Sequence, residues 1–253
     1  MAKIVSVHSF RRSTGKSSIT ANVSALFAKK GKRVGVIDTD VNSPGLHFFF
    51  QIDREEIDKT LNDYLWGQCA IEEAAYDVSA KLGVEGSIYL IPSSTRAGEI
   101  VRALREGYDV SLLNKGFRTL IDKLNLDYLF VDTHSGLNEE TLLSIAISDT
   151  LLLILRTDQQ DFQGTAVTVD LARKLGIPHL YLVVNEAISS YDFDALRKQV
   201  EETYNAPVVA IIPLSEVFAS QQSSTIFSLR FPDHPFSQHF ANIVAVIETP
   251  DKV

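Results

Sequence analysis

Cysteine is almost absent from this sequence, and the shortage excludes several kinds of site. Cys69 is the only cysteine among the 253 residues, so the chain can form no internal disulfide, no CxxC redox pair and no cysteine-rich metal site. A chain without disulfides suits a reducing compartment. We therefore expect a cytoplasmic protein.

Long apolar runs are also missing. The longest run, residues 151–155, is far shorter than the roughly 20 residues that a membrane-spanning helix needs. Residues 1–4 lead directly into a strand pattern, without the apolar core of a signal peptide. The sequence therefore predicts neither a membrane span nor a secretory leader.

Positive charge is in the minority. The chain has 24 lysines and arginines against 32 aspartates and glutamates, which gives a formal net charge of -8 and a pI of about 5.3. The molecule as a whole therefore does not attract nucleic acid or anionic lipid. No repeat or linker divides the chain, and its length allows one sizeable core. We predict a single domain over residues 1–253.

Apolar β-branched runs alternate with helical patterns along the chain. The predicted strands are 4–7, 34–37, 88–91, 128–131, 151–155, 180–184 and 208–212. The predicted helices are one closed by Gly31 and those at 97–105, 110–124, 138–147, 162–175 and 193–204. Near-continuous apolar strands separated by helices indicate an α/β fold, a mostly parallel twisted sheet with helices on both faces.

Polar segments follow several of these strands. Ligands of such a sheet bind outside the carboxyl ends of its strands, and those ends share one rim. The polar segments that would meet there are 8–17, 38–45, 132–136, 156–161 and residue 185.

The first polar segment has the context of a phosphate-binding loop. Gly15-Lys16-Ser17 stands where a strand and loop lead into a helix. In such loops backbone N–H groups hold polyphosphate, a lysine reaches the β- and γ-oxygens, and a hydroxyl binds Mg²⁺. Lys16 and Ser17 match the last two roles, although Phe10 breaks the strict motif by replacing its first glycine. The alternative interpretation is an ordinary helix start.

Together these motifs resemble the ParA/MinD family of deviant Walker P-loop ATPases, whose loop reads KGGxGK[ST]. The resemblance runs in order from Lys3 to Ile247 and implies a P-loop NTPase fold of the SIMIBI type. Besides the loop, it rests on Asp38-Thr39-Asp40, Pro44-Gly45-Leu46, the switch Asp132 to Leu137, Asn185 and Ile212-Pro213.

The resemblance implies ATP and Mg²⁺ as cofactors and gives the matching residues roles. The expected ATP contacts are Arg11, Arg12, Ser13, Thr14, Gly15, Lys16, Ser17 and Ser18 around the phosphates, and Asn185, Ile212 and Pro213 around the base. The expected Mg²⁺ residues are Ser17, Asp38 and Asp132. The expected catalytic residues are Asp40, Lys16 and Arg11. Each carboxylate has an alternative interpretation as a turn or capping residue, and we interpret His134 as a solvated loop residue rather than a base.

Three positions of the loop depart from the family pattern. Arg11 replaces a lysine that in relatives reaches across a dimer interface to the partner's phosphates, and arginine differs from lysine in reach and shape. Arg12 and Ser13 replace glycines, which serve where φ is positive or the backbone approaches a ligand. Their side chains would crowd the site, or Arg12 would add a phosphate contact. We predict slow or partner-dependent hydrolysis.

The implied function is an ATP-dependent dimerising switch that positions or partitions a cargo with the help of an adaptor protein. The cargo would be DNA, a protein organelle such as a carboxysome, or a division component. One alternative is a nucleotide-binding pseudo-ATPase scaffold. Another is a metabolic P-loop enzyme of the dethiobiotin-synthetase type, for which we find no substrate motif. Iron–sulfur relatives are excluded because one cysteine cannot supply paired ligands.

Two surfaces bear on membrane and DNA binding. An apolar stripe of Phe240, Ile243, Val244 and Ile247 precedes a lysine-poor tail, which predicts packing on the core and no membrane binding through the tail. Non-specific DNA binding, with association to the nucleoid, stays open in this interpretation. Its candidate residues, which are equally typical of solvated helix faces, are Arg173, Lys174, Arg197, Lys198 and Arg230.

Overall fold

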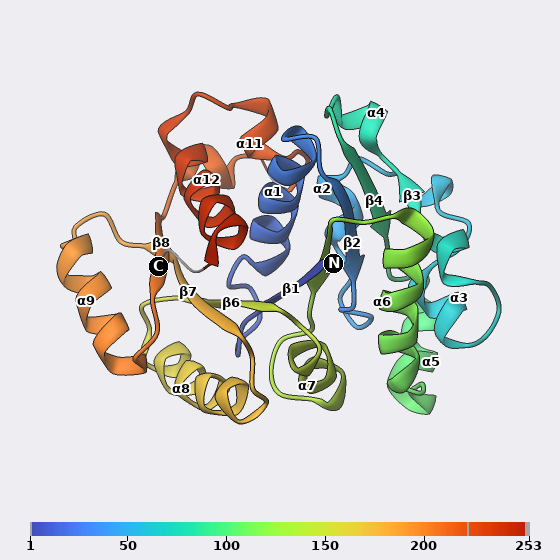
Figure 1. The fold of residues 1–253 in the computed structure, drawn as a ribbon, viewed down its shortest axis with the longest axis horizontal. Coiled ribbons are helices and arrows are strands. Elements are labelled where there is room, and N and C mark those ends of the chain that lie inside the picture. Colours follow the sequence, from blue (N-terminus) through green and yellow to red (C-terminus); the bar gives the residue numbers. More distant parts are fainter. Residues whose placement is uncertain (1, 222, 251–253) are drawn as a thin grey trace.

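An eight-stranded sheet runs through the centre of the computed structural model, which describes residues 2–221 and 223–250 (Figure 1). The strand order is β3-β4-β2-β5-β1-β6-β7-β8. Every neighbouring pair is parallel except β3 and β4. The strands are β1 (Lys3–His8), β2 (Arg33–Asp38), β3 (Tyr76–Asp77), β4 (Ser87–Ile91), β5 (Tyr128–Asp132), β6 (Thr150–Leu155), β7 (His179–Ala187) and β8 (Val208–Pro213).

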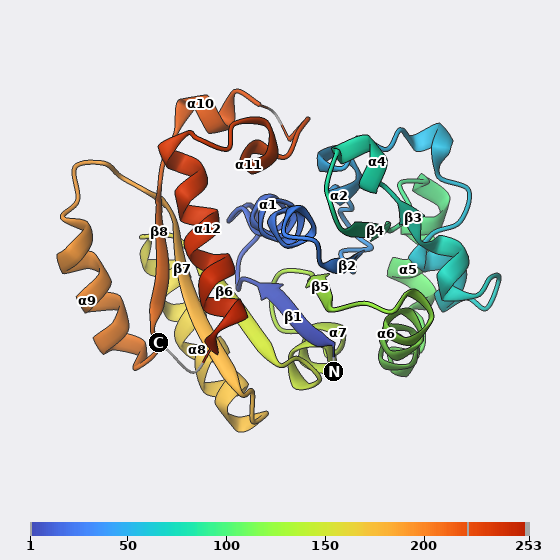
Figure 2. The ribbon, with the colours of Figure 1, turned by 45° about the horizontal axis from the view of Figure 1, so that its top comes forward.

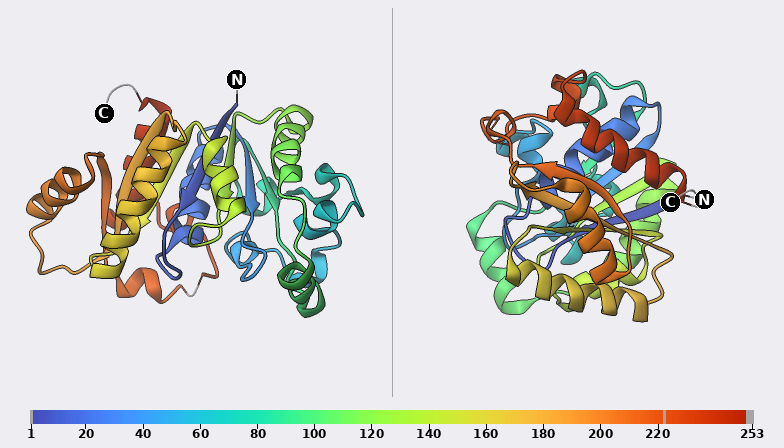
Figure 3. Two further views of the ribbon diagram at one scale, coloured as in Figure 1. Left: turned by 90° about the horizontal axis from the view of Figure 1, so that it is seen from below. Right: turned by 90° about the vertical axis from the view of Figure 1, so that its left-hand side faces the viewer.

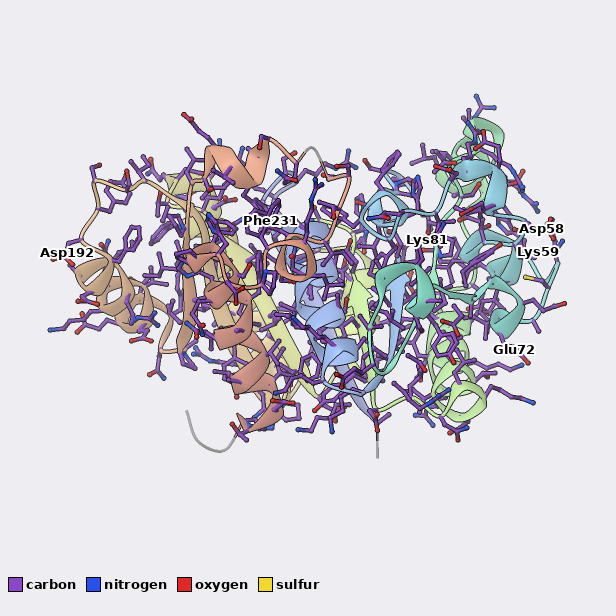
Figure 4. All side chains as sticks on the ribbon, turned by 90° about the horizontal axis from the view of Figure 1, so that it is seen from above. Asp58, Lys59, Glu72, Lys81, Asp192 and Phe231 are labelled. Atoms are coloured by element: carbon purple, nitrogen blue, oxygen red, sulfur yellow. The ribbon has the colours of Figure 1, made fainter. Side chains whose placement is uncertain are left out.

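Helices cover both faces of this sheet. One layer contains α1 (Lys16–Lys29), α2 (Leu46–Phe49), α4 (Ser79–Leu82), α11 (Phe227–Arg230) and α12 (Pro235–Glu248). Figure 2 shows α1 between α12 and α2, and Figure 4 looks onto this layer, with Lys81 of α4 labelled. The opposite layer, which faces the viewer on the left of Figure 3, contains α6 (Ser111–Leu124), α7 (Glu139–Ala146), α8 (Gln159–Lys174) and α9 (Phe193–Tyr204). The predicted α/β class, a mostly parallel sheet with helices on both faces, is confirmed.

The central strands are apolar on both faces because both faces are covered. In β2, Val34 and Val36 pack in the cluster beneath α1, while Ile37 packs with Phe117 of α6 on the other side. The alternation follows from the two-residue period of a strand. It explains why the sequence shows continuous apolar runs in place of alternating ones.

The region between β2 and β4 differs from the expectation. It contains the short helices α2 and α4, the helix α3 (Leu61–Leu65), the 3₁₀ helices η1 (Arg54–Glu56) and η2 (Ile71–Ala74), and the antiparallel edge strand β3. After β4, the helix α5 (Ala97–Glu106) matches the helix predicted at 97–105, whereas the short α10 (Glu216–Ala219) after β8 was not predicted. Most of these segments are too short for a sequence period to be visible.

The C-terminal helix α12 packs on the core, as its apolar stripe predicts. Phe240, Ile243, Val244 and Ile247 are all buried, and they join the cluster beneath α1. Residues 251–253 of the tail lie outside the described residues. Among the described residues, no helix is both long enough and apolar enough to cross a membrane.

We expect the protein to stay in the supernatant when it is centrifuged with anionic vesicles, ATP and Mg²⁺. The apolar face that an amphipathic anchor would insert is already buried against α1 and β8. A deletion of α12 is a poor control because it removes core side chains. Circular dichroism of the recovered protein should instead show that it is folded. Pelleting of folded protein that depends on anionic lipid would contradict the expectation.

Candidate functional site

The loop between β1 and α1 has the backbone shape that its glycine pattern requires. Gly15 has a φ of 89°, and a Cβ at this position would lie 2.3 Å from Nδ2 of Asn185. Only glycine fits both constraints. Ser13, which replaces a family glycine, keeps a positive φ of 58°. The loop therefore retains a glycine-like path although the glycine itself is gone.

Lys16 points back into this loop. Its ammonium donates hydrogen bonds to Ser135 Oγ at 2.6 Å and Ser9 Oγ at 3.2 Å. The side chain is buried, and burial lowers the pKa of Lys16 although the carboxylates of Asp132 and Asp40 act to raise it. Among the described residues it makes no ion pair within 4.0 Å. A buried ammonium on two neutral hydroxyls is well placed to receive an anion.

Two cavities adjoin this loop. The first, here called the loop cavity, has a volume of about 340 Å³ and is lined by residues 12–18 together with Asp40, Ser135 and others. The second, here called the side cavity, measures about 200 Å³ and is lined by Asn185, Pro213 and Phe218 among others. Gly15, Ser18, Phe49 and Ser223 line both. The two together can hold a ligand with a charged end and a flat apolar end.

Two hydroxyls of the loop lack partners. Thr14 Oγ1 and Ser18 Oγ are buried and make no hydrogen bond to any described residue. A buried polar group without a partner costs about 1–3 kcal/mol. A phosphate in the loop cavity would accept hydrogen bonds from hydroxyls of this kind, so the residues present fit a polyphosphate ligand.

Asp38 and Asp132 face each other from adjacent strands. They are register partners in the pairing of β2 with β5, and each is about 1% exposed. Burial raises the pKa of Asp38, and the neighbouring Asp132 raises it further. Burial also raises the pKa of Asp132, to about 6, against the opposing effect of Lys16. Two buried carboxylates side by side favour a bound cation or proton between them.

The two carboxylates have different partners. Asp38 accepts backbone N–H groups from Asp40 at 3.0 Å and from Gly45 and Leu46 at 3.2 Å each, so it fixes the segment after β2. From the described residues, the Asp132 carboxylate accepts only side-chain hydroxyls, from Ser17 and, at 3.3 Å, from Thr20. Ser17 and Asp132 therefore fit Mg²⁺ better than Asp38 does.

The described residues contain no group of three His, Cys, Asp or Glu side chains arranged to hold a metal. Mg²⁺ beside a nucleotide needs no such group, because it keeps waters and phosphate oxygens as ligands and takes only one or two from the protein.

His134 corrects one interpretation made from the sequence. It is not a solvated loop residue, since its side chain is only 12% exposed and its Nδ1 lies 2.7 Å from Asp40 Oδ1. Burial alone would raise the pKa of Asp40, but the hydrogen bond from His134, the charge of Lys16 and the backbone N–H of Ser43 outweigh burial and hold that pKa below its ordinary value. The sequence predicted that both residues lie at the same rim of the sheet, and this was the only indication in the sequence that they could form a hydrogen bond.

Arg11 does not reach the loop cavity in this chain. Its Nη1 lies 2.9 Å from Asp158 Oδ1, and its Nε lies 3.8 Å from Asp161 Oδ1. The preceding Phe10 packs on the same helix, because a Cβ on Gly164 of α8 would lie only 2.0 Å from its ring. The first two loop residues are thus docked on the start of α8.

Of the three residues expected to contact the base, two line the side cavity and one does not. Asn185 donates from Nδ2 to the carbonyl oxygen of Thr14 at 2.8 Å and lines the side cavity, as Pro213 also does. Ile212 is buried in the core beneath α12 and lines neither cavity. The alternation of β8 explains the difference, because successive side chains point to opposite faces.

A glycine-dependent loop before a helix, a buried lysine, and carboxylates at the ends of adjacent parallel strands define a P-loop nucleotide-binding protein. Residues 5–226 match the CobQ/CobB/MinD/ParA nucleotide-binding domain, and the chain belongs to that family. The resemblance to ParA and MinD is thereby confirmed.

Individual relatives support the same assignment. The chain is 26% identical to an uncharacterized ATP-binding protein of Methanocaldococcus jannaschii, over 97% of this chain and 87% of that protein. It is 25% identical to the flagellum site-determining protein YlxH of Helicobacter pylori, over 72% of this chain and 58% of that protein. The septum site-determining protein MinD of Pyrococcus horikoshii, solved with Mg-ADP, shares the fold with a TM-score of 0.83 at 20% identity, covering 100% of this chain and 98% of that one.

The burial of His8 predicts how the stability of the fold depends on pH. The ring is fully buried, its Nδ1 lies 2.7 Å from Thr133 Oγ1, and its Nε2 has no partner among the described residues. Burial, followed by the charge of Lys16, lowers the pKa of His8 to about 3. A depressed pKa means that the unfolded chain binds the proton first, so this stability is present above pH 6.5 and is lost as the pH falls toward 3.

We expect the free energy of unfolding to fall between pH 6.5 and pH 4 by less in His8→Gln than in the parent. The lowered pKa of His8 corresponds to on the order of 5 kcal/mol of stability once the pH has fallen below that pKa. Urea unfolding at several pH values measures it. Parallel pH dependences in the two proteins would show that other groups control acid unfolding.

Proposed function

We propose that this protein is an ATP-dependent dimerising switch that positions or partitions a cargo, with slow, partner-stimulated ATP hydrolysis. The observation that carries the proposal is the buried Lys16 ammonium on neutral hydroxyls, beside the partnerless hydroxyls of Thr14 and Ser18. ATP would place its phosphates in the loop cavity and its base in the side cavity. Ser17 and Asp132 would hold Mg²⁺, which when bound neutralises charge on the β- and γ-phosphates.

The positioning role is supported by what the relatives are called. Two of them are a flagellum and a septum site-determining protein, and both names describe the placement of a cellular structure. A cargo of that kind would be read by an adaptor protein. A purely structural nucleotide site is less favoured, because Asp40 is held at the loop cavity as a carboxylate.

A protein adaptor is favoured over DNA as the first partner. The candidate basic side chains are already engaged: Arg173 with the Asn205 carbonyl, Lys174 with Asp170, Arg197 with the Val208 carbonyl, Lys198 with Glu202, and Arg230 with the Phe231 ring. With a net charge of -8 on the chain, these residues offer little attraction for phosphate backbones.

Arg11 is proposed to move from α8 to the partner's phosphates when two ATP-bound chains meet. Its pairing with Asp158 joins side chains that are 36% and 42% exposed, and such pairs contribute roughly 0.2–1 kcal/mol. Its second partner, the buried Asp161, lies 3.8 Å away and keeps a closer ion pair with Arg156, at 3.3 Å, when Arg11 leaves. A charged hydrogen bond in a closed interface contributes about 1.5–3 kcal/mol. Arg11 therefore gains more free energy from the partner's phosphate than it loses by leaving Asp158, once the dimer forms.

Arg11→Ala should weaken the ATP-dependent dimer by at least about tenfold, by the loss of one charged hydrogen bond per site. Light scattering with ATP and Mg²⁺ measures the dimer, and calorimetry with ADP should show unchanged binding to the monomer. Arg11→Lys is the matched variant and should restore part of the dimer. Equal dimerisation by Arg11→Ala and the parent would assign this role to another residue, and absence of a dimer in the parent would overturn the switch itself.

A further inference from the structure

The two oxygens of the Asp40 carboxylate have different surroundings. Oδ1 accepts the backbone N–H of Ser43 at 3.0 Å and a hydrogen bond from Nδ1 of His134 at 2.7 Å. Oδ2 has no hydrogen-bond partner among the described residues, and Asp40 lines the loop cavity. One oxygen is therefore fixed by two donors, and the other is available to a molecule in the cavity.

The ring of His134 is held on its other side by Arg12. Its Nε2 lies 3.5 Å from Nη2 of Arg12. A guanidinium can only donate hydrogen bonds, so Nε2 accepts and the proton of a neutral ring is on Nδ1. That nitrogen then donates to Asp40. The hydrogen-bond chain from Arg12 through His134 to Asp40 has one direction.

This chain joins three separate segments of the site. Arg12 belongs to the phosphate loop, Asp40 to the segment after β2, and His134 to the segment after β5. Arg12 and Asp40 line the loop cavity, whereas His134 stands behind Asp40 and does not line it. His134 can therefore influence a ligand in the cavity only through its neighbours.

We propose that His134 and Arg12 are positioning residues for Asp40, which they orient so that its Oδ2 accepts a hydrogen bond from the attacking water. The inference rests on the proposed ATP hydrolysis and adds two residues to it. It also gives a reason for arginine at a position where the family has glycine. Arg12 donates to Nε2 of His134 and so supports the Nδ1–H tautomer that the Asp40 carboxylate also selects.

The reaction that this arrangement serves is a simple displacement. The water oxygen forms a bond to the γ-phosphorus, and the bond from that phosphorus to the β–γ bridging oxygen breaks. The products are ADP and inorganic phosphate, and the proton lost by water ends on phosphate or bulk solvent. Asp40 orients the water and need not retain the proton, which suits a carboxylate whose other oxygen is fixed.

The test compares single-turnover hydrolysis and ATP affinity in the parent, His134→Ala, His134→Asn and Asp40→Ala. Loss of one orienting hydrogen bond should slow hydrolysis about tenfold in His134→Ala, with ATP affinity unchanged within about twofold. Asparagine can still donate to Asp40, so His134→Asn should recover most of the rate. The double variant His134→Ala/Asp40→Ala should be no slower than Asp40→Ala alone, because the histidine acts through the aspartate.

A second measurement does not need turnover. Imidazole ¹⁵N NMR, with His134→Ala for assignment, should show the Nδ1–H tautomer in the parent and a mixture in Arg12→Ala. Parent-like hydrolysis in His134→Ala while Asp40→Ala is slow would overturn the positioning role alone. Failure of the parent to bind ATP would overturn the proposed function. A parent spectrum dominated by the Nε2–H tautomer would overturn the inference irrespective of rate.

Discussion

Replacing Lys16 by alanine is expected to abolish ATP binding. The lysine is the buried cation of the loop cavity, and its ammonium now rests on the hydroxyls of Ser9 and Ser135. Hydrogen bonds to charged groups contribute about 1.5–3 kcal/mol each, and an ammonium would make more than one to a triphosphate. We therefore expect at least a hundredfold loss of affinity, measured by isothermal titration calorimetry with ATP and Mg²⁺.

The loss should not reflect unfolding. Lys16 lies at the start of α1 and makes no ion pair with a described residue, so Lys16→Ala should melt near the temperature of the nucleotide-free parent. Lys174→Ala is the matched control, because Lys174 pairs with Asp170 at the far end of α8. It should bind ATP as the parent does. Unchanged ATP affinity in Lys16→Ala would show that the nucleotide does not bind at this loop.

The long elements of the fold could be predicted from the sequence because burial imposes a visible period on them. The helix predicted at 193–204 has those bounds in the structure, and the strand predicted at 128–131 is one residue longer. Between β2 and β4 the helices have three to five residues each, which is about one turn. Capping bonds such as that of Thr60 with Asp63 define them, and such bonds leave little trace in a hydrophobic pattern.

The site was predictable where the backbone decides the position. Residues that directly follow strands, such as Asp132 and Asn185, had to reach the same rim. Side-chain direction was not predictable in the same way. Arg11 follows a loop path that places it against Asp158, and the position of Ile212 on β8 turns it into the core. Such outcomes depend on neighbours that are distant in sequence.

Steady-state hydrolysis is the second large effect that the structure predicts. Basal turnover should lie far below the median of about 10 s⁻¹ for enzymes, because Arg11 is on α8 in the single chain and stabilises no charge at the loop cavity. Asp40→Ala should lower this turnover by about a hundredfold, because the attacking water loses the carboxylate that orients it. Asp132→Ala should lower it similarly by removing the buried carboxylate beside Ser17.

Release of inorganic phosphate, followed continuously with and without a candidate adaptor or DNA, measures these rates. Asp122→Ala is the matched control, since Asp122 is exposed on α6 and lines neither cavity. It should match the parent. An adaptor that promotes the proposed dimer should raise the rate, because dimerisation would bring Arg11 of each chain to the other's phosphates. Fast turnover by the monomer that is insensitive to Asp40→Ala would contradict both the switch and the role of the carboxylate, whereas slow turnover that depends on Asp40 but not on Arg11 would contradict only the crossing arginine.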